Sequence, residues 1–555
     1  MPEPSNTEPP VSAWAPLKRP LFRYRLLASI VSNTGSWMQD TAGTWLMTAL
    51  TNSPLLIALM QTAATLPVLL FGLPAGAMAD IFDRRRLLLF WASWMLVAAA
   101  LLSLFTVCGW IGISSLLVLT FLLSLGSAMN GPTWQAIVPE LVPREELPNA
   151  VALNSAGFNL ARAAGPALGG LIVAAFASVY FGAGLVFSLN ALSFVAVLVV
   201  IYRWRRKPFF KSALPAERLL GSMRAGARYV RFEPVMRAIL ARAFIQTFGV
   251  SGMWALLAVV AKANLRDGAM GYGILNGCIG LGAVIGAMLL PRLRQKFSPD
   301  DIISGAAVVF AGTLLVMAYA HVWFLLMAGL VCGGIAWTST ASSLNISVQL
   351  SVPAWVQARA LGTYQMVFQG GLAIGSAFWG GLAERFGATP SLSVAGVSLL
   401  VTLPFTRRFS VSAGLNLDRS PGRLVSSLRR AGPQIIIEPN PEDGPVMITV
   451  TFKIDPARAT EFVEAAFELG RVRSRDGAMR WSLFSDPFDP SRYVETYVLD
   501  SWLERQRQLE RFTVADHAIR NRVFALHVDP NPPVVSRMIL ARAPNHPSSP
   551  NRGPV

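Results

Sequence analysis

Long apolar runs separated by short polar loops fill residues 21–407 of the chain. A run of 18 or more predominantly apolar residues is long enough to cross a bilayer as a helix. The pattern predicts an all-α polytopic membrane protein with two six-helix halves, at 21–203 and 236–407, joined by a linker loop at 204–235. We place its twelve spans near residues 25–50, 55–79, 87–108, 114–138, 150–177, 181–203, 236–261, 271–291, 302–320, 323–349, 356–383 and 388–406.

After residue 407 the pattern changes to that of a soluble chain. Residues 408–445 are rich in Arg, Ser, Gly and Pro, which indicates a linker. Residues 446–542 then alternate strand-like and amphipathic stretches in the order β-α-β-β-α-β, which predicts an α+β ferredoxin-like domain. The expected strands are Val446–Ile454, Met479–Ser485, Tyr493–Leu499 and Val534–Leu540, and the expected helices are Asp455–Leu469 and Ser501–Phe524. We expect a disordered tail at 543–555.

Composition and charge support a membrane protein. The chain is 53% hydrophobic and its mean hydropathy is +0.47, which does not suit a soluble protein of 555 residues. A net charge of +17 is typical of nucleic-acid-binding proteins, but here the basic residues gather in alternate loops between spans. By the positive-inside rule those loops face the cytosol, and so do both termini, including a tail at 1–20. We therefore expect the lipid bilayer as surroundings and no nucleic-acid partner.

The sequence predicts no cofactor, no metal and no cleaved signal peptide. Cys108, Cys278 and Cys332 lie far apart, and no pair has metal-ligand spacing. The N-terminus is polar and proline-rich and lacks an early apolar stretch.

A short charged loop, Gly76-Ala-Met-Ala-Asp80-Ile-Phe-Asp83-Arg84-Arg85-Arg86, separates spans 2 and 3. Its glycine, acid and basic cluster resemble the loop between helices 2 and 3 of major facilitator superfamily transporters, although Asp83 stands where the superfamily usually has glycine. The resemblance implies the major facilitator fold. It also implies a gating loop made of Gly76, Asp80, Asp83, Arg84, Arg85 and Arg86.

The residue types in this loop suit a conformational latch. Gly76 would let spans 2 and 11 pack backbone to backbone. Asp80 would lie against the positive N-terminal end of span 11. The arginines would pair with nearby acids, Asp83 among them, and hold the cytoplasmic side shut. The alternative is that Arg84–Arg86 only set the membrane topology.

Three stretches give a narrower resemblance: Asn130–Pro143, Leu147–Asn154 and Asn159–Gly170. They resemble the major facilitator family that contains the enterobactin exporter and related drug-efflux proteins, the transmembrane secretion effectors. The resemblance implies a proton-coupled secondary active transporter of the bacterial inner membrane. Such a protein would export a small amphiphilic molecule (a siderophore, antibiotic or other secondary metabolite) by alternating access, with its site between the halves. A lysophospholipid-type carrier is the alternative.

The C-terminal domain has a resemblance of its own. Asp476-Gly-Ala with Trp481, and Glu495 to Trp502, resemble the antibiotic-biosynthesis-monooxygenase-like domains fused to some transporters of this family. Arg505 and Leu509 stand where fused relatives carry histidines. We therefore expect a regulatory or dimerising role, and no enzyme. A bifunctional transporter with an enzymatic C-terminal domain is the alternative.

Two ionisable residues are predicted to lie deep in spans, Asp40 in span 1 and Arg162 in span 5. Because a charge in the bilayer interior is costly, each is a functional candidate. They either take part in proton coupling, form a fixed ion pair within the first half, or contact substrate.

Neutral polar residues inside the spans mark a candidate substrate pathway, although such groups often only join helices by hydrogen bonds. The candidates are Asn33, Asn130, Gln135, Asn154, Gln246, Asn276, Asn345, Gln365 and Gln369. The expected partners are a small-molecule substrate, protons as coupling ion and, through the C-terminal domain, a second copy of the chain.

Overall fold

The computed structural model describes residues 14–143, 146–204, 219–264, 268–353, 355–412, 418–419 and 439–541. It divides into two compact units. The helical unit comprises Met1–Pro215, Ala238–Val348 and Leu361–Ser412, and the C-terminal unit comprises Ala216–Arg237, Gln349–Ala360 and Ala413–Val555. Parts of both predicted linkers and of the N-terminal tail, and the whole predicted tail at 543–555, lie outside the described residues.

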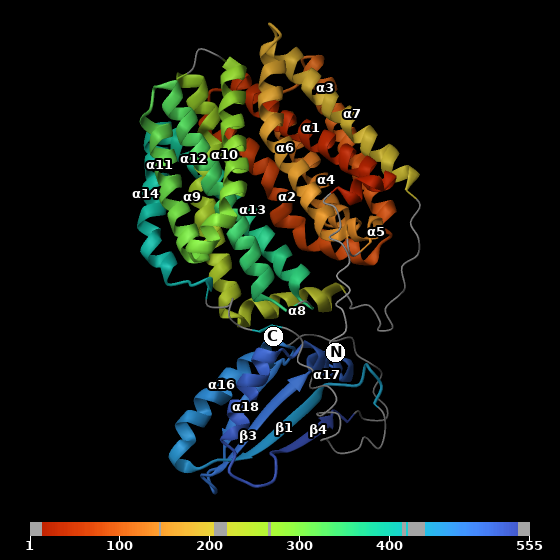
Figure 1. Cartoon of the computed structure of the whole chain (residues 1–555), viewed down its shortest axis with the longest axis vertical. Helices are drawn as coiled ribbons and strands as arrows, with labels where there is room; N and C mark the ends of the chain where they lie inside the picture. Colours follow the sequence, from red (N-terminus) through yellow and green to blue (C-terminus); the bar gives the residue numbers. More distant parts are fainter. Residues whose placement is uncertain are drawn as a thin grey trace, which may run out of the picture. The chain divides into compact units, whose positions relative to one another are not determined.

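Twelve long helices make up the described part of the helical unit (Figure 1). Each span predicted from the sequence falls on one of them. They are α1 (Pro20–Leu50), α2 (Pro54–Ile81), α3 (Arg84–Val107), α4 (Ile113–Ala136), α6 (Leu147–Ala174), α7 (Val179–Arg203), α9 (Pro234–Asn264), α10 (Gly268–Lys296), α11 (Pro299–Tyr319), α12 (Trp323–Ser351), α13 (Gln357–Phe386) and α14 (Ala388–Arg407). The short turn η1 (Ala15–Lys18) precedes α1, and the short helix α5 (Val138–Leu141) lies between α4 and α6 in the sequence.

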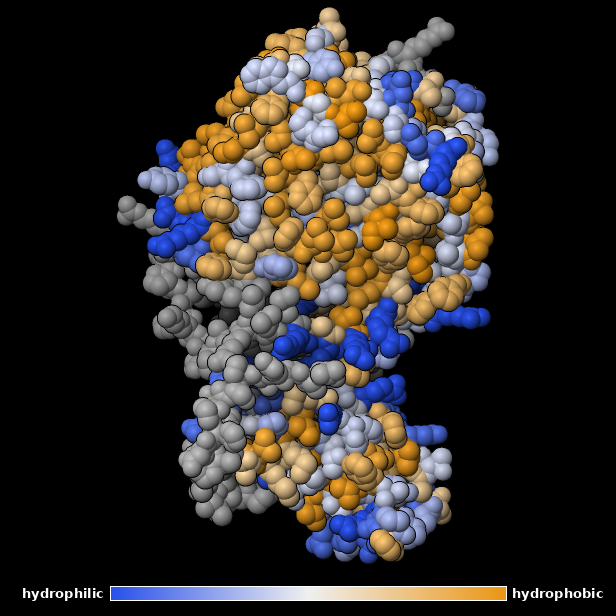
Figure 2. All heavy atoms as spheres, turned by 180° about the vertical axis from the view of Figure 1, so that it is seen from behind, coloured by the Kyte–Doolittle hydropathy of each residue, from blue (hydrophilic) through white to orange (hydrophobic). Residues whose placement is uncertain are grey.

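Ten of these helices are long and apolar enough to cross a membrane. The other two are α1 and α6, which are richer in polar residues and carry Arg25, Asp40 and Arg162. That α1 and α6 also span the membrane stays a prediction. Figure 2 shows apolar side chains over the outer face of the helical unit, and exposed large residues such as Phe90, Val97 and Met288 contribute to its surface. An apolar surface of this extent is expected where a protein faces lipid.

Glycines bring α6 and α10 into backbone contact, side by side in Figure 1. A Cβ added to Gly170 would lie 2.7 Å from the Cα of Gly273, and one added to Gly280 would lie 2.7 Å from the Cα of Ala163. Small residues at helix crossings are what allow such close packing in membranes. Since α6 belongs to the first six-helix half and α10 to the second, this crossing joins the halves.

The C-terminal unit contains a four-stranded antiparallel sheet in the order β2-β3-β1-β4. One face of β1 packs into the core, since Val446, Ile448, Val450 and Phe452 are at most 2% exposed. The elements are α8 (Leu219–Phe232), β1 (Val446–Lys453), η4 (Pro456–Arg458), α16 (Ala459–Arg475), β2 (Arg480–Ser485), β3 (Arg492–Leu499), α17 (Trp502–Arg511), α18 (Val514–Ala525) and β4 (Val534–Ile539).

The single helix predicted at Ser501–Phe524 is wrong, because the structure has two helices there, α17 and α18. The break lies at Phe512 and Thr513. The Thr513 hydroxyl accepts a hydrogen bond from the Asp516 backbone N–H, and the Asp516 carboxylate accepts one from the Thr513 backbone N–H. This reciprocal capping box starts a new helix and ends the previous one.

Candidate functional site

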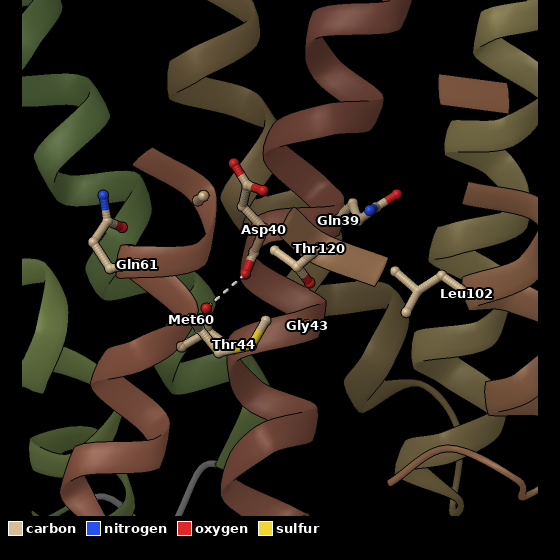
Figure 3. Close-up of a pocket in the computed structure, with 9 residues that line it drawn as sticks. Gln39, Asp40, Gly43, Thr44, Met60, Gln61, Leu102 and Thr120 are labelled. Carbon is tan, nitrogen blue, oxygen red and sulfur yellow. Dashed lines mark hydrogen bonds between the residues drawn. The ribbon is translucent and has the colours of Figure 1, made fainter. Parts of the chain in front are cut away.

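A pocket in the first six-helix half lies beside Asp40 (Figure 3). The Asp40 side chain is exposed, while its backbone carbonyl accepts a hydrogen bond from the Thr44 hydroxyl at 2.8 Å. Among the described residues, no hydrogen bond or ion pair reaches the Asp40 carboxylate. The lining residues are Gln39, Asp40, Gly43 and Thr44 of α1, Met60, Gln61 and Ala64 of α2, Leu102 of α3 and Thr120 of α4.

The adjoining face of α1 is fixed against α7, which explains why Asp40 is held at the pocket. Asn190 of α7 donates a hydrogen bond to the Gln39 side chain at 2.6 Å, and Asn190 is fully buried. A Cβ added to Gly35 would lie 2.6 Å from Asn190 Oδ1, so α1 and α7 approach closely there. Gln39 therefore anchors the helix, and the neighbouring Asp40 is left facing the pocket.

Arg162 is not joined to Asp40, so the fixed ion pair expected as one alternative is absent among the described residues. The Arg162 guanidinium instead lies over two indole rings, 5.8 Å from the centre of Trp37 and 5.7 Å from that of Trp337. Trp37 belongs to α1 and Trp337 to α12, which are in different halves. Arg162 therefore lies between aromatic rings of both six-helix halves.

Several of the neutral pathway candidates are engaged in the protein's own hydrogen bonds. Asn33 donates to Ser29, Asn154 accepts from Arg25, and Gln246 donates to Ile303 and Thr340. These three join residues of the helical bundle. Gln135 and Gln365 are exposed, and the side-chain oxygen of Asn130 is buried without a hydrogen-bond partner in the described part of the chain. Asn276, Asn345 and Gln369 are half-buried.

The charged loop between α2 and α3 makes local contacts. Asp83 accepts a hydrogen bond from the Arg86 backbone N–H at 2.9 Å and so caps α3. Arg85 donates to the carbonyls of Ile201 and Tyr202, at the end of α7. The Asp80 side chain lies outside what the structure describes. The contacts described here begin α3 and hold it to α7.

The expected backbone contact at Gly76 is not present in this conformation. A Cβ added to Gly76 would meet no described atom within 4 Å. Gly76 lies at what we call the linker end of the helical unit, where α7 ends at Arg203 and α9 begins at Pro234. An alanine Cβ at Gly76 would therefore meet no described atom here, and the latch stays a prediction for another conformation.

At the opposite end, hereafter the far end, the two halves are bonded together. A Cβ added to Gly380 of α13 would lie 2.4 Å from the Cβ of Ala58 of α2. The Glu384 carboxylate accepts hydrogen bonds from the Ser53 hydroxyl at 2.6 Å and from the Leu55 backbone N–H at 3.3 Å. The Lys262 ammonium donates to the Asn52 side chain at 2.8 Å and to the Thr48 carbonyl.

Two buried arginines went unnoticed in the sequence, which indicated only Asp40 and Arg162 as deep ionisable residues. Arg25 and Arg242 are each 2% exposed. Arg25 donates to Asn154 and to the Trp134 carbonyl, both at 3.0 Å, and Arg242 pairs with Asp300. Arg25 lies at the first residue of its predicted span and Arg242 within the first two turns of its own, and both are enclosed by neighbours that the sequence pattern does not identify.

Ten helices long and apolar enough to cross a membrane, with polar side chains buried between them, are typical of a membrane transport protein. The match to the transmembrane secretion effector family covers residues 11–545, and the chain belongs to that family. The match includes the C-terminal unit.

Curated relatives agree with this assignment. An MFS-type transporter of Bacillus subtilis, YfiS, is 27% identical over 403 residues, covering 69% of this chain and 93% of the relative. The staphyloferrin A transporter of Staphylococcus aureus is 22% identical, with 69% and 95% covered. The enterobactin exporter EntS of Shigella boydii is 25% identical, with 69% and 90% covered.

Solved transporters share the fold. The nucleoside transporter NupG matches with a TM-score of 0.56 and 12% identity, covering 70% of this chain and 99% of NupG. A bacterial homolog of the human lysosomal transporter Spinster, in an inward-facing and occupied conformation, matches with a TM-score of 0.57 and 15% identity, with 71% and 97% covered. At these identities the likeness concerns the fold alone.

Proposed function

We propose that the chain is a proton-coupled secondary active transporter of the bacterial inner membrane. It would span the membrane twelve times and export a small amphiphilic molecule by alternating access. The names of two relatives support export of a siderophore-like cargo, since they are a staphyloferrin A transporter and an enterobactin exporter. The observation that carries the mechanism is the difference between the two ends of the helical unit.

Alternating access requires that the halves part at one end while they stay joined at the other. Here Glu384 and Lys262 join the halves by hydrogen bonds at the far end. At the linker end a Cβ added to Gly76 meets no described atom within 4 Å, although one turn earlier a Cβ added to Gly72 would lie 3.0 Å from Met366 of α13. The basic loops favour a cytosolic linker end, with both termini on the same side. The conformation would then be one that loads cargo from the cytosol, as an exporter requires.

Arg162 and its two tryptophans suit an amphiphilic cargo. A guanidinium in an apolar setting attracts an anionic group, and indole rings offer flat apolar surfaces. Among the described residues no carboxylate pairs with Arg162, so its charge is available to a substrate. Its contacts come from both halves, which is where a site for alternating access belongs.

Asp40 is our candidate for the proton-carrying group. Its carboxylate faces a pocket and has no basic partner among the described residues, so it is able to gain and lose a proton without breaking an ion pair. A proton bound there from the outer side and released to the cytosol would drive the return of the empty carrier.

The test is an Asp40→Asn substitution in a strain that lacks the chromosomal gene. The wild-type chain is expected to restore a secreted metabolite to the medium, in a manner abolished by a protonophore. Asp40→Asn is expected to fall to the level of the empty vector, with normal amounts of protein in the membrane. The matched control is Asp301→Asn, an acid that bonds Ser298 at the start of α11. Undiminished export by Asp40→Asn would end the coupling hypothesis.

The same strain distinguishes the cargo classes. Loss of a secreted metabolite supports the proposed exporter. Accumulation of lysophospholipid in the membrane, with an unchanged medium, would overturn it in favour of the lipid carrier.

For the C-terminal unit we propose a ferredoxin-like fold with a regulatory or dimerising role. The order of its elements and strands supports the fold. The sheet face opposite the core carries Phe484, Val534 and Met538, which are 56%, 66% and 54% exposed and would pair two chains. A monomeric mass for the full-length protein in mild detergent would contradict pairing. Turnover of a quinol, or of haem with a reductant, by the full-length protein would favour the bifunctional alternative.

A further inference from the structure

Arginines outnumber carboxylates around the buried ring of Tyr497 in the C-terminal unit. Four arginines lie around that ring: Arg473 of α16, which is buried, and Arg505 of α17, Arg520 of α18 and Arg537 of β4, which are half-buried. Buried arginines are normally matched by carboxylates, because an unpaired charge is costly away from water. We therefore ask which of these arginines has a carboxylate partner and which has none.

The sheet register places Arg537 on the face that the helices cover. Arg537 lies opposite Ile448 of β1, and Ile448 lies opposite Tyr497 of β3. Directly opposed residues share a face of the sheet. Ile448 is fully buried and Tyr497 is 2% exposed, so Arg537 points to the core side.

Arg473 is paired with a carboxylate. Its Nε lies 3.4 Å from Glu495 Oε1, which also accepts a hydrogen bond from Trp481 Nε1 at 3.0 Å. Its guanidinium lies 4.8 Å from the centre of the Tyr497 ring. Glu495 is 2% exposed and neutralises Arg473.

The other three arginines, unlike Arg473, lack a carboxylate partner in the described part of the chain. Among the described residues, no carboxylate lies within ion-pair distance of Arg505, Arg520 or Arg537. The Arg520 guanidinium lies over the ring of Phe524, 4.4 Å from its centre. Burial and the charges of Arg473 and Arg537 lower the pKa of Arg505, and burial and the charge of Arg473 lower the pKa of Arg520. Guanidinium groups nevertheless stay charged at neutral pH.

The side-chain amide of Gln508, which contacts Arg505, also lacks a hydrogen-bond partner for its nitrogen among the described residues. Gln508 is 1% exposed, and its Oε1 accepts a hydrogen bond from Arg505 Nη1 at 2.9 Å. Its Nε2 is buried without a hydrogen-bond partner in the described structure, and so is Arg537 Nε. Buried donors without acceptors are uncommon in folded proteins. They indicate that an acceptor belongs beside Arg505.

His517 adds no charge to this region. Burial and the charge of Arg520 lower the pKa of His517 below its usual value, so the ring is neutral at pH 7. The acid beside these arginines is Glu495. Its Oε1 lies 3.4 Å from Arg473 Nε, and its Oε2 is buried without a hydrogen-bond partner in the described structure. The three remaining guanidinium groups and the Gln508 amide nitrogen are all donors.

We propose that Arg505, Arg520 and Arg537, with Gln508, form a binding site for a small anion of the carboxylate or phosphate class. Guanidinium groups bind such anions with paired N–H donors, which suits a ligand with more than one negative oxygen. The site is separate from the transport pathway and does not depend on the proposed function. Its ligand would come from the cytosol if the C-terminal unit lies there.

The experiment is calorimetric titration of the full-length protein in detergent with citrate and, separately, with inorganic phosphate, at low ionic strength. Both probes are expected to bind, with citrate tighter because it carries more charge. Arg505→Gln and Arg537→Gln are each expected to weaken binding by about tenfold or more, since each removes a charged hydrogen-bond donor. Arg505→Lys should give an intermediate loss of affinity, because lysine keeps the positive charge but lacks the paired N–H donors of the guanidinium group.

The matched control is Arg522→Gln, on the same helix α18, whose guanidinium pairs with Glu468 on the surface at 2.9 Å. It should bind both anions as the wild type does. Thermal unfolding separates lost binding from lost folding. In anion-free buffer Arg505→Gln should be at least as stable as wild type, since it removes repulsion, whereas citrate should stabilise only the wild type and the control. Absence of binding by wild type up to about 10 mM, which is weaker than most specific sites, or equal binding by wild type and Arg505→Gln, would overturn the proposal.

Discussion

A single arginine shows how charge is balanced at the residue scale in the C-terminal unit. Arg475 contacts three acids: Asp476 at 2.8 Å, Asp516 at 2.7 Å and Glu233 at 3.3 Å. Burial raises the pKa of Asp476 to about 6, although the charge of Arg475 opposes this. Burial acts on Asp516 as well, but Arg475 and hydrogen bonds from Thr513 outweigh it and lower the pKa of Asp516. The two acids therefore titrate in different pH ranges.

Asp476 is expected to make the C-terminal unit more stable as the pH falls from about 7 to about 5. Its pKa is about 6 in the folded chain, above its ordinary value of 3.8, so the folded form binds a proton that the unfolded form releases. The ionised form is costly above pH 6, and protonation removes that cost. Asn at position 476 does not titrate, so acidification from about pH 7 to about pH 5 should stabilise the wild type relative to Asp476→Asn by on the order of 1 kcal/mol.

Hydrogen exchange of the β1 and β3 amides in the full-length protein, at both pH values, measures this difference. His517 acts in the opposite direction, because its lowered pKa makes protonation unfavourable in the folded chain. It is present in both proteins and cancels in the comparison. Asp516 stays ionised over this range. A difference between the proteins that does not change with pH would contradict the assignment.

At the scale of the element, the crossing of α6 and α10 depends on the absence of side chains. Gly273→Ala is expected to destabilise the helical unit by roughly 1–3 kcal/mol, the usual cost of overpacking. Its Cβ would lie 2.8 Å from the Cα of Gly170, where backbone has no room to move away. The melting temperature of the purified protein in detergent measures the effect.

Gly312→Ala of α11 is the control for that substitution, since a Cβ added to Gly312 meets no described atom within 4 Å. Alanine there should leave the melting temperature unchanged or raise it slightly, because alanine favours helix more than glycine does. Equal effects at both positions would show that helix propensity, and not the crossing, determines the result.

At the scale of the whole transporter, the far-end bonds are expected to set which side is open. Lys262→Ala with Glu384→Ala removes the hydrogen bonds to Asn52 and Ser53, and should shift the population toward a conformation closed at the linker end. In a background without native cysteines, Gly76→Cys should then react more slowly with a soluble maleimide than it does with the far-end bonds intact. The paired control is Arg385→Ala, next to Glu384 in the sequence. An unchanged reaction rate at Gly76→Cys would mean that these bonds do not act as a gate.

The positions of the helices could be predicted because spanning a bilayer requires a long apolar run, and that run is visible locally. The ranges predicted for α2 and α14, for instance, end within two residues of the observed helices. The alternation of apolar and polar residues along β1 was equally visible in the sequence. The break between α17 and α18 was missed, although Thr513 and Asp516 have the spacing of a capping box, because the amphipathic pattern continues through it.

The candidate site was only partly visible. Asp40 and Arg162 were found by their cost in an apolar run, but whether they meet depends on how α1 and α6 pack, which no local pattern records. The lining of the Asp40 pocket by Gln61 and Thr120 comes from helices that are distant in the sequence. The arginines around Tyr497 are likewise brought together only by the register of the sheet and the helices that cover it.

The sequence by itself determined the class of protein, the number and place of the long helices, and the charged loop after α2. Each follows from interactions of a segment with its solvent, lipid or water, and these depend on composition alone. Only the tertiary structure decided that Glu384 and Lys262 bind the other half, and that Arg505, Arg520 and Arg537 have no carboxylate partner among the described residues. Those are contacts between distant segments, and their energies depend on packing that the order of residues does not state.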